Sequence, residues 1–585
     1  MPGNPSQAPH ATWAMPAVLA IVAAVYAPSL LSGFNADDYL ILAKIKSVGG
    51  LGDPLAYFQF AFYDYFRPVA FLSHALDWQL WGVNPVGFHV TNLILHLANT
   101  WLVFHVGRGL VGGRSATLGA LLFGLHPASH EAVYWIAARF DLLATFFTLT
   151  AVMCLARDGR SWRAAGLTAF GLALLSKESA ISLLVIAPAR DVFIGRLDWR
   201  LTLRRLLPLV GIVVAYSLAR HVGADLDAVG GSRRLPKLFM TAGALAALLM
   251  LARSPERQPI GSRFYDAAER ARWPLAIAVV LVPGAVLLWP PAFPWLAEKL
   301  GFVAYVSFYA ISPVVFPAPP HDWFLPDTAL RAMPHLLVLG AIVWLALKVL
   351  RLYAGRVDEA AFLSVFAVAS LVPVSSMTGG LRYLYLATAG LAPLAALLLH
   401  RLAPSRAVVP AAIIVLLAAS VQQVLHAGRA WRAAAVTTRE GIALMSAATR
   451  PCGTKDVVLL TAPAGIGGVY GNLSWDAFDV LTGCAPRSLT ALLRVVRTDA
   501  RVDTRSVGAD IVDLRVPDYR GNIVASEDLR NFTRVIEPGE TTTMQTAAGR
   551  LETFAEGTTQ VFRWTLTGEF PRAARFYYSE GRVRQ

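Results

Sequence analysis

Long apolar segments separated by short charged loops dominate the first three quarters of the chain. Most segments have about the 20 residues that a helix needs to cross the roughly 30 Å hydrocarbon core of a bilayer. The pattern predicts an all-α polytopic membrane region over residues 13–427. Its thirteen predicted spans are 13–31, 88–107, 115–133, 141–157, 163–176, 179–194, 203–222, 236–252, 273–290, 330–350, 359–378, 381–400 and 407–427.

Two further apolar or terminal segments are not predicted to behave as ordinary spans. Segment 293–317 contains Glu298, Lys299, many aromatic residues and flanking prolines, which favour an interfacial or re-entrant position. Residues 1–12 are polar, and the first span ends without a small-residue cleavage motif. This predicts a cytoplasmic N-terminus followed by a retained anchor instead of a signal peptide.

The tail, residues 428–585, has a different pattern. Short β-branched runs such as DVVLLTAP, DIVDLRV and TQVFRWTLTG are separated by Gly and Pro, which is typical of strands in a soluble domain. Cys452 and Cys484 lie in this tail, and Cys154 lies in a predicted span. An oxidising compartment would permit a disulfide between the two tail cysteines, and two free buried thiols are the alternative.

The distribution of Lys and Arg predicts the orientation. With the N-terminus inside, the six short inside loops hold 20 Lys and Arg residues in 65 positions, as the positive-inside rule requires. The first loop, 32–87, and the tail then lie outside, in a cell membrane. Composition agrees with this class, because 56% of residues are hydrophobic and 15% are charged, against about 25% charged in soluble domains. Topology accounts for much of the net charge of +14, so nucleic-acid binding is not indicated.

Candidate chemistry gathers on the predicted outer face. Asp37 and Asp38, in GFNADDYLILAK, stand at the head of the first external loop, directly after the first span. In the second span, four polar residues fall within about 80° of one helical face: His89, Asn92, His96 and Asn99. Interhelical hydrogen bonding is the plainer interpretation of the deeper pair, His96 and Asn99. His89, at the outer end, is the better site candidate.

The external turn between the third and fourth spans, LHPASHEAVYWIAARFDLLA, collects further polar residues: His126, His130, Glu131, Arg139 and Asp141. The proline after His126 disfavours helical geometry there, and the spacing is not that of an H-E-x-x-H zinc motif. A polar cluster lining an external cavity is therefore preferred over a metal site. An ordinary ion pair between Arg139 and Asp141 is the alternative.

Three more cations are predicted near the outer surface. Lys177 stands beside Glu178 in LLSKESA, Arg382 precedes Tyr383 in SSMTGGLRYLYLATAG, and Arg67 lies between aromatic residues in YFRPVAFLSHALD. A cation at this depth suits the phosphate of a lipid-linked molecule. The plainer alternatives are a Lys177–Glu178 pair that caps a hairpin and an arginine that only snorkels to the surface.

Taken in order, these segments resemble a known family. NADDYLIL, FRPVAFLSHALDWQLWGVNPVGFHVTNLILH, LFGLHPASHEAVYWIAARFDLLATFF, LLSKESA and LRYLYLATAG are similar to the membrane half of the TMTC-type protein O-mannosyltransferases, which belong to the GT-C superfamily. The similarity runs from about residue 20 to 190 and again near 370–395. TMTC proteins continue into TPR helices, whereas this tail predicts a β-containing domain, so a TMTC-like acceptor does not follow.

The resemblance implies a GT-C fold and a transferase that moves a sugar, a mannose-like hexose, from a polyprenyl-phosphate donor to a hydroxyl of a protein or glycan. It implies that Asp37 is the catalytic base and that Asp38 positions it or shares its role. Lys177, Arg382 and Arg139 would bind the donor phosphate. The cavity would be lined by Arg67, His89, His126, His130, Glu131, Asp141 and Glu178. A divalent metal is not expected, although some GT-C enzymes use one.

Two other classes of function compete with this interpretation. A transporter or flippase of lipid-linked sugars would share the polar cavity and the cations. It would more often show inverted repeats and paired broken helices, and the sequence shows neither. The third class, a degenerate GT-C scaffold that serves as an assembly factor, is disfavoured by the intact Asp37–Asp38 pair.

Overall fold

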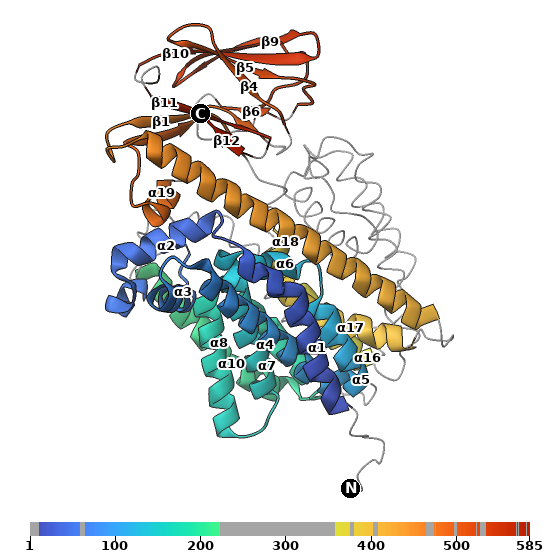
Figure 1. Ribbon diagram of the computed structural model, residues 1–585. Coiled ribbons are helices and arrows are strands. Elements are labelled where there is room, and N and C mark those ends of the chain that lie inside the picture. The colour runs from blue at the N-terminus through green and yellow to red at the C-terminus, as the bar shows by residue number, and fades with distance from the viewer. Residues whose placement is uncertain are drawn as a thin grey trace, which may run out of the picture.

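In the computed structural model, a helical bundle lies beside a β-sheet domain, and one long helix runs from the bundle to that domain (Figure 1). The chain is mostly helical in its membrane region and β-rich at its C-terminal end. The structure describes residues 11–58, 65–222, 357–374, 380–401, 408–463, 473, 475–495, 500–521, 523–526, 534–568, 570, 573–580 and 582–585.

The helical part follows the apolar segments of the sequence. Its described α-helices are α1 (Ala11–Tyr26), α2 (Asp37–Val48), α3 (Pro68–Trp81), α4 (Pro85–Val111), α5 (Gly113–Gly124), α6 (Ser129–Tyr134), α7 (Arg139–Leu155), α8 (Arg160–Ser176), α9 (Leu183–Phe193), α10 (Trp199–Val222), α16 (Val357–Leu371), α17 (Tyr385–Arg401), α18 (Val408–Ala448) and α19 (Trp475–Leu481). Short 3-10 helices connect them: η1 (Ala27–Leu31), η2 (Gly50–Gly52), η3 (Pro54–Phe58), η4 (Ile136–Ala138), η5 (Glu178–Ser182) and η11 (Leu381–Leu384).

Five described segments are long and apolar enough to cross a membrane: Ala14–Leu31, Ile136–Leu155, Trp199–Arg220, Leu381–His400 and Ile413–Ala448. The predicted spans 236–252, 273–290 and 330–350, and the predicted re-entrant segment 293–317, lie outside the described residues. The predicted count of thirteen therefore stays a prediction.

Two helix ends differ most from the predicted spans. Helix α5 ends at Gly124, although the prediction continues to residue 133. The cause is Pro127, because a proline disfavours helical geometry in the residue that precedes it. The chain turns there, and the next helix is α6. Helix α18 has 41 residues, which is about 60 Å at 1.5 Å per residue, so the predicted span 407–427 covers only its first half. Its second half runs along the bundle to the β-domain (Figure 1).

The C-terminal domain contains the strands β1 (Asp456–Pro463), β2 (Ser488–Ala491), β3 (Arg494–Val495), β4 (Asp503–Ser506), β5 (Ile511–Val516), β6 (Ile523–Ala525), β7 (Arg534–Val535), β8 (Thr542–Thr546), β9 (Gly549–Glu556), β10 (Thr559–Leu566), β11 (Ala574–Ser579) and β12 (Arg582–Arg584). Among the described residues, one sheet of seven strands has the order β12-β11-β1-β3-β6-β7, with β2 paired to β1, and a five-stranded sheet has the order β4-β5-β10-β9-β8. In the seven-stranded sheet, β1 is parallel to β2, β3 and β11. The five-stranded sheet is antiparallel.

A disulfide joins Cys452 to Cys484. It links the segment before β1 to the segment after α19, and it decides between the two alternatives for these cysteines. Cys154 is a free, buried thiol in α7.

The long helix packs on the turn between α5 and α7, and helix α19 of the C-terminal domain packs on the first external loop. The Trp431 ring of α18 lies 5.8 Å from the Trp135 ring, and a Cβ on Gly428 would come within 2.4 Å of the Tyr134 hydroxyl. On the β-domain side, Lys46 of α2 pairs with Asp479 of α19 at 2.8 Å. In the turn before α2, the Asn35 side chain donates a hydrogen bond to the Trp431 carbonyl oxygen at 3.5 Å. Helix α18 therefore contacts the turn before the predicted base, and α19 contacts the last turn of α2.

Candidate active site

The turn before α2 has a strained backbone. Ala36 adopts φ 44° and ψ −115°, a conformation that residues with a side chain rarely adopt. Such a residue costs roughly 1–3 kcal/mol and persists only where its surroundings hold it. The strain lies directly before Asp37, and both Asp37 and Asp38 occupy the first turn of α2, where the helix dipole favours carboxylates.

Asp38 is a buried residue that holds this turn in place. Its Oδ2 accepts a hydrogen bond from the Asn35 N–H at 2.8 Å, and its Oδ1 accepts one from the Ala137 N–H at 2.7 Å. Burial raises the pKa of Asp38 well above its usual range, although these two hydrogen bonds oppose the rise. Both oxygens are thus committed to tying α2 to η4, which gives Asp38 a positioning role.

Asp37 differs from Asp38 in its exposure and in its contacts. Its side chain is exposed, and it makes no hydrogen bond or ion pair within the described ranges. The desolvating protein around it raises the pKa of Asp37, and the charge of Arg382 opposes that rise. A carboxylate that has no partner and a raised pKa is suited to accept a proton.

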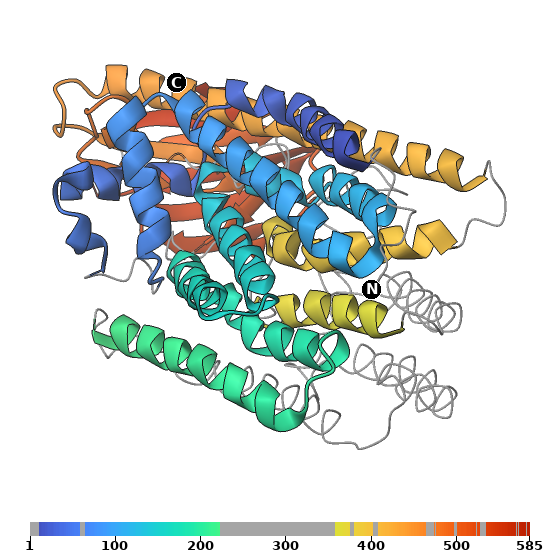
Figure 2. The same ribbon diagram turned by 90° about the horizontal axis from the view of Figure 1, so that it is seen from below.

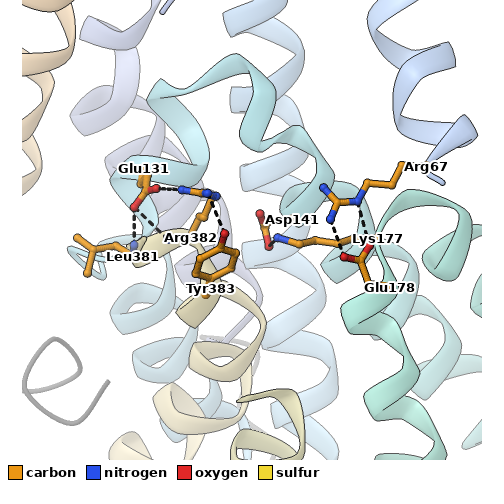
Figure 3. Close-up of polar contacts among 8 residues, drawn as sticks. All are labelled: Arg67, Glu131, Asp141, Lys177, Glu178, Leu381, Arg382 and Tyr383. Carbon is orange, nitrogen blue, oxygen red and sulfur yellow. Dashed lines mark hydrogen bonds and ion pairs between the residues drawn. The ribbon is translucent and has the colours of Figure 1, made fainter. Parts of the chain in front are cut away.

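Six of the predicted site residues form three ion pairs that lie in one row (Figure 3): Glu131 with Arg382, Asp141 with Lys177, and Glu178 with Arg67. Each pair joins segments that are far apart in the sequence. The structure therefore brings together the start of α3, helix α6, the start of α7, the α8–η5 junction and η11. Because three carboxylates balance three cations, the row has no net charge.

Tyr383 lies between the first two pairs. Its hydroxyl is 2.9 Å from Arg382 Nη2, and its ring centroid is 4.5 Å from the Arg382 guanidinium carbon and 4.8 Å from Lys177 Nζ. The Arg382 guanidinium carbon also lies 4.5 Å from the Trp135 ring centroid. Aromatic faces stabilise both cations, and Lys177 and Arg382 both contact the Tyr383 ring.

Lys177 is held at the α8–η5 junction with 4% of its side chain exposed, and its Nζ lies 2.5 Å from Asp141 Oδ1. Burial lowers the pKa of Lys177 to about 8, although Asp141 acts in the opposite direction. An ammonium group has three donors. Within the described residues, one hydrogen bond to Asp141 and the face of Tyr383 occupy this group, so it retains a donor for an anion.

Arg67 and Glu178 form the third pair. The two hydrogen bonds between them measure 2.7 Å and 3.0 Å, and the Arg67 guanidinium carbon lies 4.1 Å from the Tyr65 ring centroid. Burial alone would raise the pKa of Glu178, but Arg67 outweighs burial and lowers it to about 2. The predicted alternative, a local Lys177–Glu178 pair, is wrong, because each residue pairs with a different segment.

Arg139, predicted as a phosphate ligand, lies elsewhere. It is fully buried and pairs with Asp77 at 2.6 Å. It also donates hydrogen bonds to Asn92 Oδ1, to the carbonyl oxygen and hydroxyl of Ser73, and to the Phe88 carbonyl oxygen. These contacts use all five guanidinium donors. Arg139 therefore joins α3, α4 and α7, and the phosphate assignment is wrong; the alternative pair with Asp141 is wrong as well.

The polar face of α4 is internal. His96 Nδ1 lies 2.7 Å from the Tyr385 hydroxyl, His96 Nε2 lies 3.0 Å from the Gly124 carbonyl oxygen, and Asn99 donates to the Leu142 carbonyl oxygen at 3.0 Å. The plainer interpretation of His96 and Asn99 as interhelical contacts is confirmed. His89 is also fully buried, and its place in the cavity stays a prediction.

The two histidines of the α5–α6 turn make separate local contacts. His126 Nδ1 accepts a hydrogen bond from the Ala128 N–H at 3.1 Å, and His130 Nδ1 donates to the Pro127 carbonyl oxygen at 2.6 Å. Both are half-buried, and their place in the cavity stays a prediction. No group of three His, Cys, Asp or Glu side chains that could hold a metal occurs in the part of the chain that the structure describes.

Sequence reasoning missed Ala36, Asn35 and Asp77. Asp77 had a signal, because it is an acid within the apolar run AFLSHALDWQLW, and such an acid needs a partner. The sequence gives no signal for Asn35 or Ala36. Asn35 holds Asp38 through its peptide N–H, and Ala36 has a positive φ, and both are properties of the backbone.

Comparison with known proteins supports the resemblance over part of the chain. No family model matches. The chain is 39% identical over 137 residues to the protein O-mannosyl-transferase Tmtc1 of Drosophila melanogaster, which is 22% of this chain and 16% of that protein. It is 31% identical over 156 residues to TMTC2 of Mus musculus, 25% of this chain and 18% of that protein. It is a distant homologue of TMTC O-mannosyltransferases over about a quarter of its length.

Solved structures give a broader and weaker likeness. An oligosaccharyltransferase of Archaeoglobus fulgidus, crystallised with a tethered acceptor peptide, aligns with a TM-score of 0.43 and 14% identity over 81% of this chain and 64% of that chain. ArnT of Cupriavidus metallidurans, bound to undecaprenyl phosphate, aligns with a TM-score of 0.33 and 13% identity over 81% of this chain and 85% of that chain. The chain spans less than a fifth of Tmtc1 and TMTC2.

Proposed function

We propose that this protein is a membrane glycosyltransferase of the GT-C type, which transfers a mannose-like hexose from a polyprenyl phosphate to a hydroxyl of a protein or glycan. The observation that carries the proposal is Asp37, an exposed carboxylate without a partner in the described structure, beside the row of three ion pairs that contains Arg382. The segment similarity to protein O-mannosyl-transferases supports the same chemistry.

Asp37 acts as the general base in this proposal. It removes the proton of the acceptor hydroxyl while that oxygen attacks the anomeric carbon of the sugar. The bond between the anomeric carbon and the phosphate oxygen breaks, and its electron pair leaves with the polyprenyl phosphate. A single displacement of this kind inverts the anomeric centre, so a product that retains the donor configuration would contradict the mechanism.

Lys177 and Arg382 stabilise the departing phosphate. A polyprenyl phosphate is already a stable anion, so it needs charge stabilisation more than a general acid. The row has no net charge, which means that long-range attraction cannot hold the donor. Binding depends on direct contact with individual cations, and Lys177 has a donor available for it.

The reaction takes place on the extracytoplasmic face of a cell membrane. The distribution of Lys and Arg favours an external position for the first loop, and the Cys452–Cys484 disulfide suits an oxidising compartment. Because α18 and α19 pack on the loop that carries Asp37, we assign the C-terminal domain to acceptor binding near the base.

The test compares the wild type, Asp37→Asn and Asp53→Asn in nanodiscs supplied with radiolabelled polyprenyl-phosphate mannose and a membrane extract as the source of acceptor. We expect Asp37→Asn to lower the rate of transfer by about 10²–10⁴, the usual contribution of a general base. Asp53 is a matched control, because it lies in the same loop and only accepts backbone hydrogen bonds from Leu55 and Ala56, which Asn preserves.

Each other outcome has a definite meaning. Equal transfer by Asp37→Asn and the wild type would remove Asp37 from catalysis. Equal donor binding by both without consumption of the donor would favour a transporter, and a flipping assay on the same nanodiscs would decide.

A further inference from the structure

A second polar site lies at the other end of the bundle. A cavity of about 290 Å³ is lined by the C-terminal ends of α7 and α9 and the N-terminal ends of α8 and α10. Asp141 and Lys177 lie at the opposite ends of α7 and α8. Since α7 has 17 residues, it is about 25 Å long, and the cavity is distinct from the candidate active site.

The cavity is strongly basic. Five arginines and two aspartates line it: Arg157, Arg160, Arg163, Arg190, Arg205, Asp158 and Asp191. The aspartates are shared among the arginines, with Asp191 at 3.4 Å from both Arg190 and Arg205. Arg160 and Arg163 make no ion pair within the described ranges. Unlike the row of ion pairs at the other end, this site has excess positive charge and suits an anion.

Two buried donors in the cavity lack partners. Thr202 is 1% exposed, and its hydroxyl makes no hydrogen bond within the part of the chain that the structure describes; the same holds for the buried Arg205 Nε. Both residues line the cavity. A buried donor without a partner is destabilising. Protein atoms cover both donors in this conformation, and an anion in the cavity would satisfy them once the two side chains turn toward it.

The surroundings of the cavity indicate a lipid. Helix α10 is a candidate span and lies at one edge of the described bundle when seen from below (Figure 2). Leading away from the cavity, it exposes an apolar stripe at helical spacing: Leu207, Val210, Val214 and Leu218. Trp162, 44% exposed, lies under the Arg157 guanidinium with 4.6 Å between its ring centroid and the guanidinium carbon. Exposed Trp residues of this kind mark the membrane–water interface.

We propose that this cavity binds the headgroup of an anionic phospholipid from the leaflet opposite to the active site. Thr202 and Arg205 donate hydrogen bonds to the phosphate, and Arg160 and Arg163 supply uncompensated charge. The acyl chains lie along the apolar stripe of α10. Basic pockets between membrane helices are known to hold such headgroups. The assignment is independent of the transferase reaction.

The test measures lipid retained by the full chain in detergent, using native mass spectrometry after incubation with phosphatidylglycerol or phosphatidylcholine. We expect the wild type to retain phosphatidylglycerol preferentially. Thr202→Val and Arg205→Gln should each weaken retention about tenfold, since each removes a hydrogen bond to a charged group. Arg204→Gln is the matched control, because Arg204 is the exposed neighbour on α10 and is not among the cavity residues.

Thr202→Val replaces a buried hydroxyl with a methyl group of similar size, and its thermal unfolding without lipid should occur at or above the wild-type temperature. Loss of lipid in this variant therefore cannot be ascribed to unfolding. Unchanged retention in Thr202→Val and Arg205→Gln would overturn the proposal. Equal loss in Arg204→Gln would do the same, because it would indicate a diffuse basic surface. Displacement of the lipid by soluble glycerol phosphate would show a site for free phosphate instead.

Discussion

The two ends of the helical bundle use the same charged residues in opposite ways. At the end near the β-domain, Arg67, Lys177 and Arg382 are each matched by a carboxylate. At the other end, five arginines and two aspartates line one cavity. Matched pairs fix side-chain positions and leave little long-range field, whereas excess charge attracts anions. The first arrangement suits chemistry at a defined atom, and the second suits retention of a charged lipid.

Arg139 and Arg382 also differ in how deeply they are buried. Arg139 is fully buried with every donor used by protein groups, whereas the side chain of Arg382 is 16% exposed. Both were predicted to bind phosphate. Residue type and position along the chain are therefore insufficient to identify a ligand-binding arginine; the number of donors that the protein itself occupies decides it.

The largest effect on stability is expected for Arg139→Gln. The substitution leaves Asp77 buried without its cation, and breaking a buried pair costs about 3–5 kcal/mol. Thermal unfolding in detergent measures the loss. Arg382→Gln is the comparison, because Glu131 keeps its hydrogen bonds from the backbone N–H groups of Leu381 and Arg382; it should retain stability and lose transfer. An equal loss of thermal stability in Arg139→Gln and Arg382→Gln would contradict the different roles assigned to the two arginines.

The next largest effect is expected for Lys177→Met, which removes the cation with an available donor. Donor affinity should fall roughly 10- to 100-fold, the equivalent of a hydrogen bond to a charged group, as measured by binding of labelled polyprenyl phosphate. The double variant Asp141→Asn with Lys177→Met removes both charges, so it should recover stability without recovering affinity. Recovery of affinity as well would assign Lys177 a purely structural role.

A third expectation concerns pH. Asp37 must be deprotonated to act as a base, and its pKa is raised, so kcat/KM should rise as pH rises through that pKa. Lys177 must be protonated to bind phosphate, and its pKa is lowered to about 8, so kcat/KM should fall above about pH 8. Lys177→Arg should move the alkaline decline to higher pH, because a guanidinium stays charged. An unmoved decline would point to another group.

The smallest effect is expected for Ala36→Gly. Glycine adopts positive φ readily, so the variant should gain about 1 kcal/mol of stability and lose transfer by roughly two- to fivefold as the turn before Asp37 loosens. Ala43→Gly, inside α2, is the matched control and should lose about 1 kcal/mol. A destabilised Ala36→Gly would mean that the strain at Ala36 is not relieved by glycine.

Much of the helical architecture was predictable because it depends on local sequence. Apolar length predicts α1, α7, α10 and α17 within a few residues of their observed bounds. The end of α5 and the second half of α18 were missed. The first depends on one proline, and the second contains Arg429, Arg432, Arg439 and Glu440, whose charges end a predicted span without ending the helix.

The residues of the candidate site were predictable from the sequence, but their ion-pair partners were not. Glu131, Asp141, Lys177, Glu178, Arg382 and Arg67 were all identified, yet the local pairs Lys177–Glu178 and Arg139–Asp141 were the wrong ones. Ion pairing depends on distances across the bundle, and neighbours in sequence at a helix end point in different directions. The partner of Arg139, Asp77, lies 62 positions earlier in the chain.

The sequence by itself determined a membrane chain with a β-containing tail, and it located an acidic pair where the first apolar segment ends. The length of an apolar segment and the bias of its flanking charges are local properties, so they can be recognised without knowing which segments pack together. Only the tertiary structure decided that Asp38 is tied to Ala137 while Asp37 stays exposed, and that Arg139 is enclosed while Lys177 keeps a donor. Those differences arise from backbone groups and side chains of distant segments, and such contacts exist only once the helices have packed.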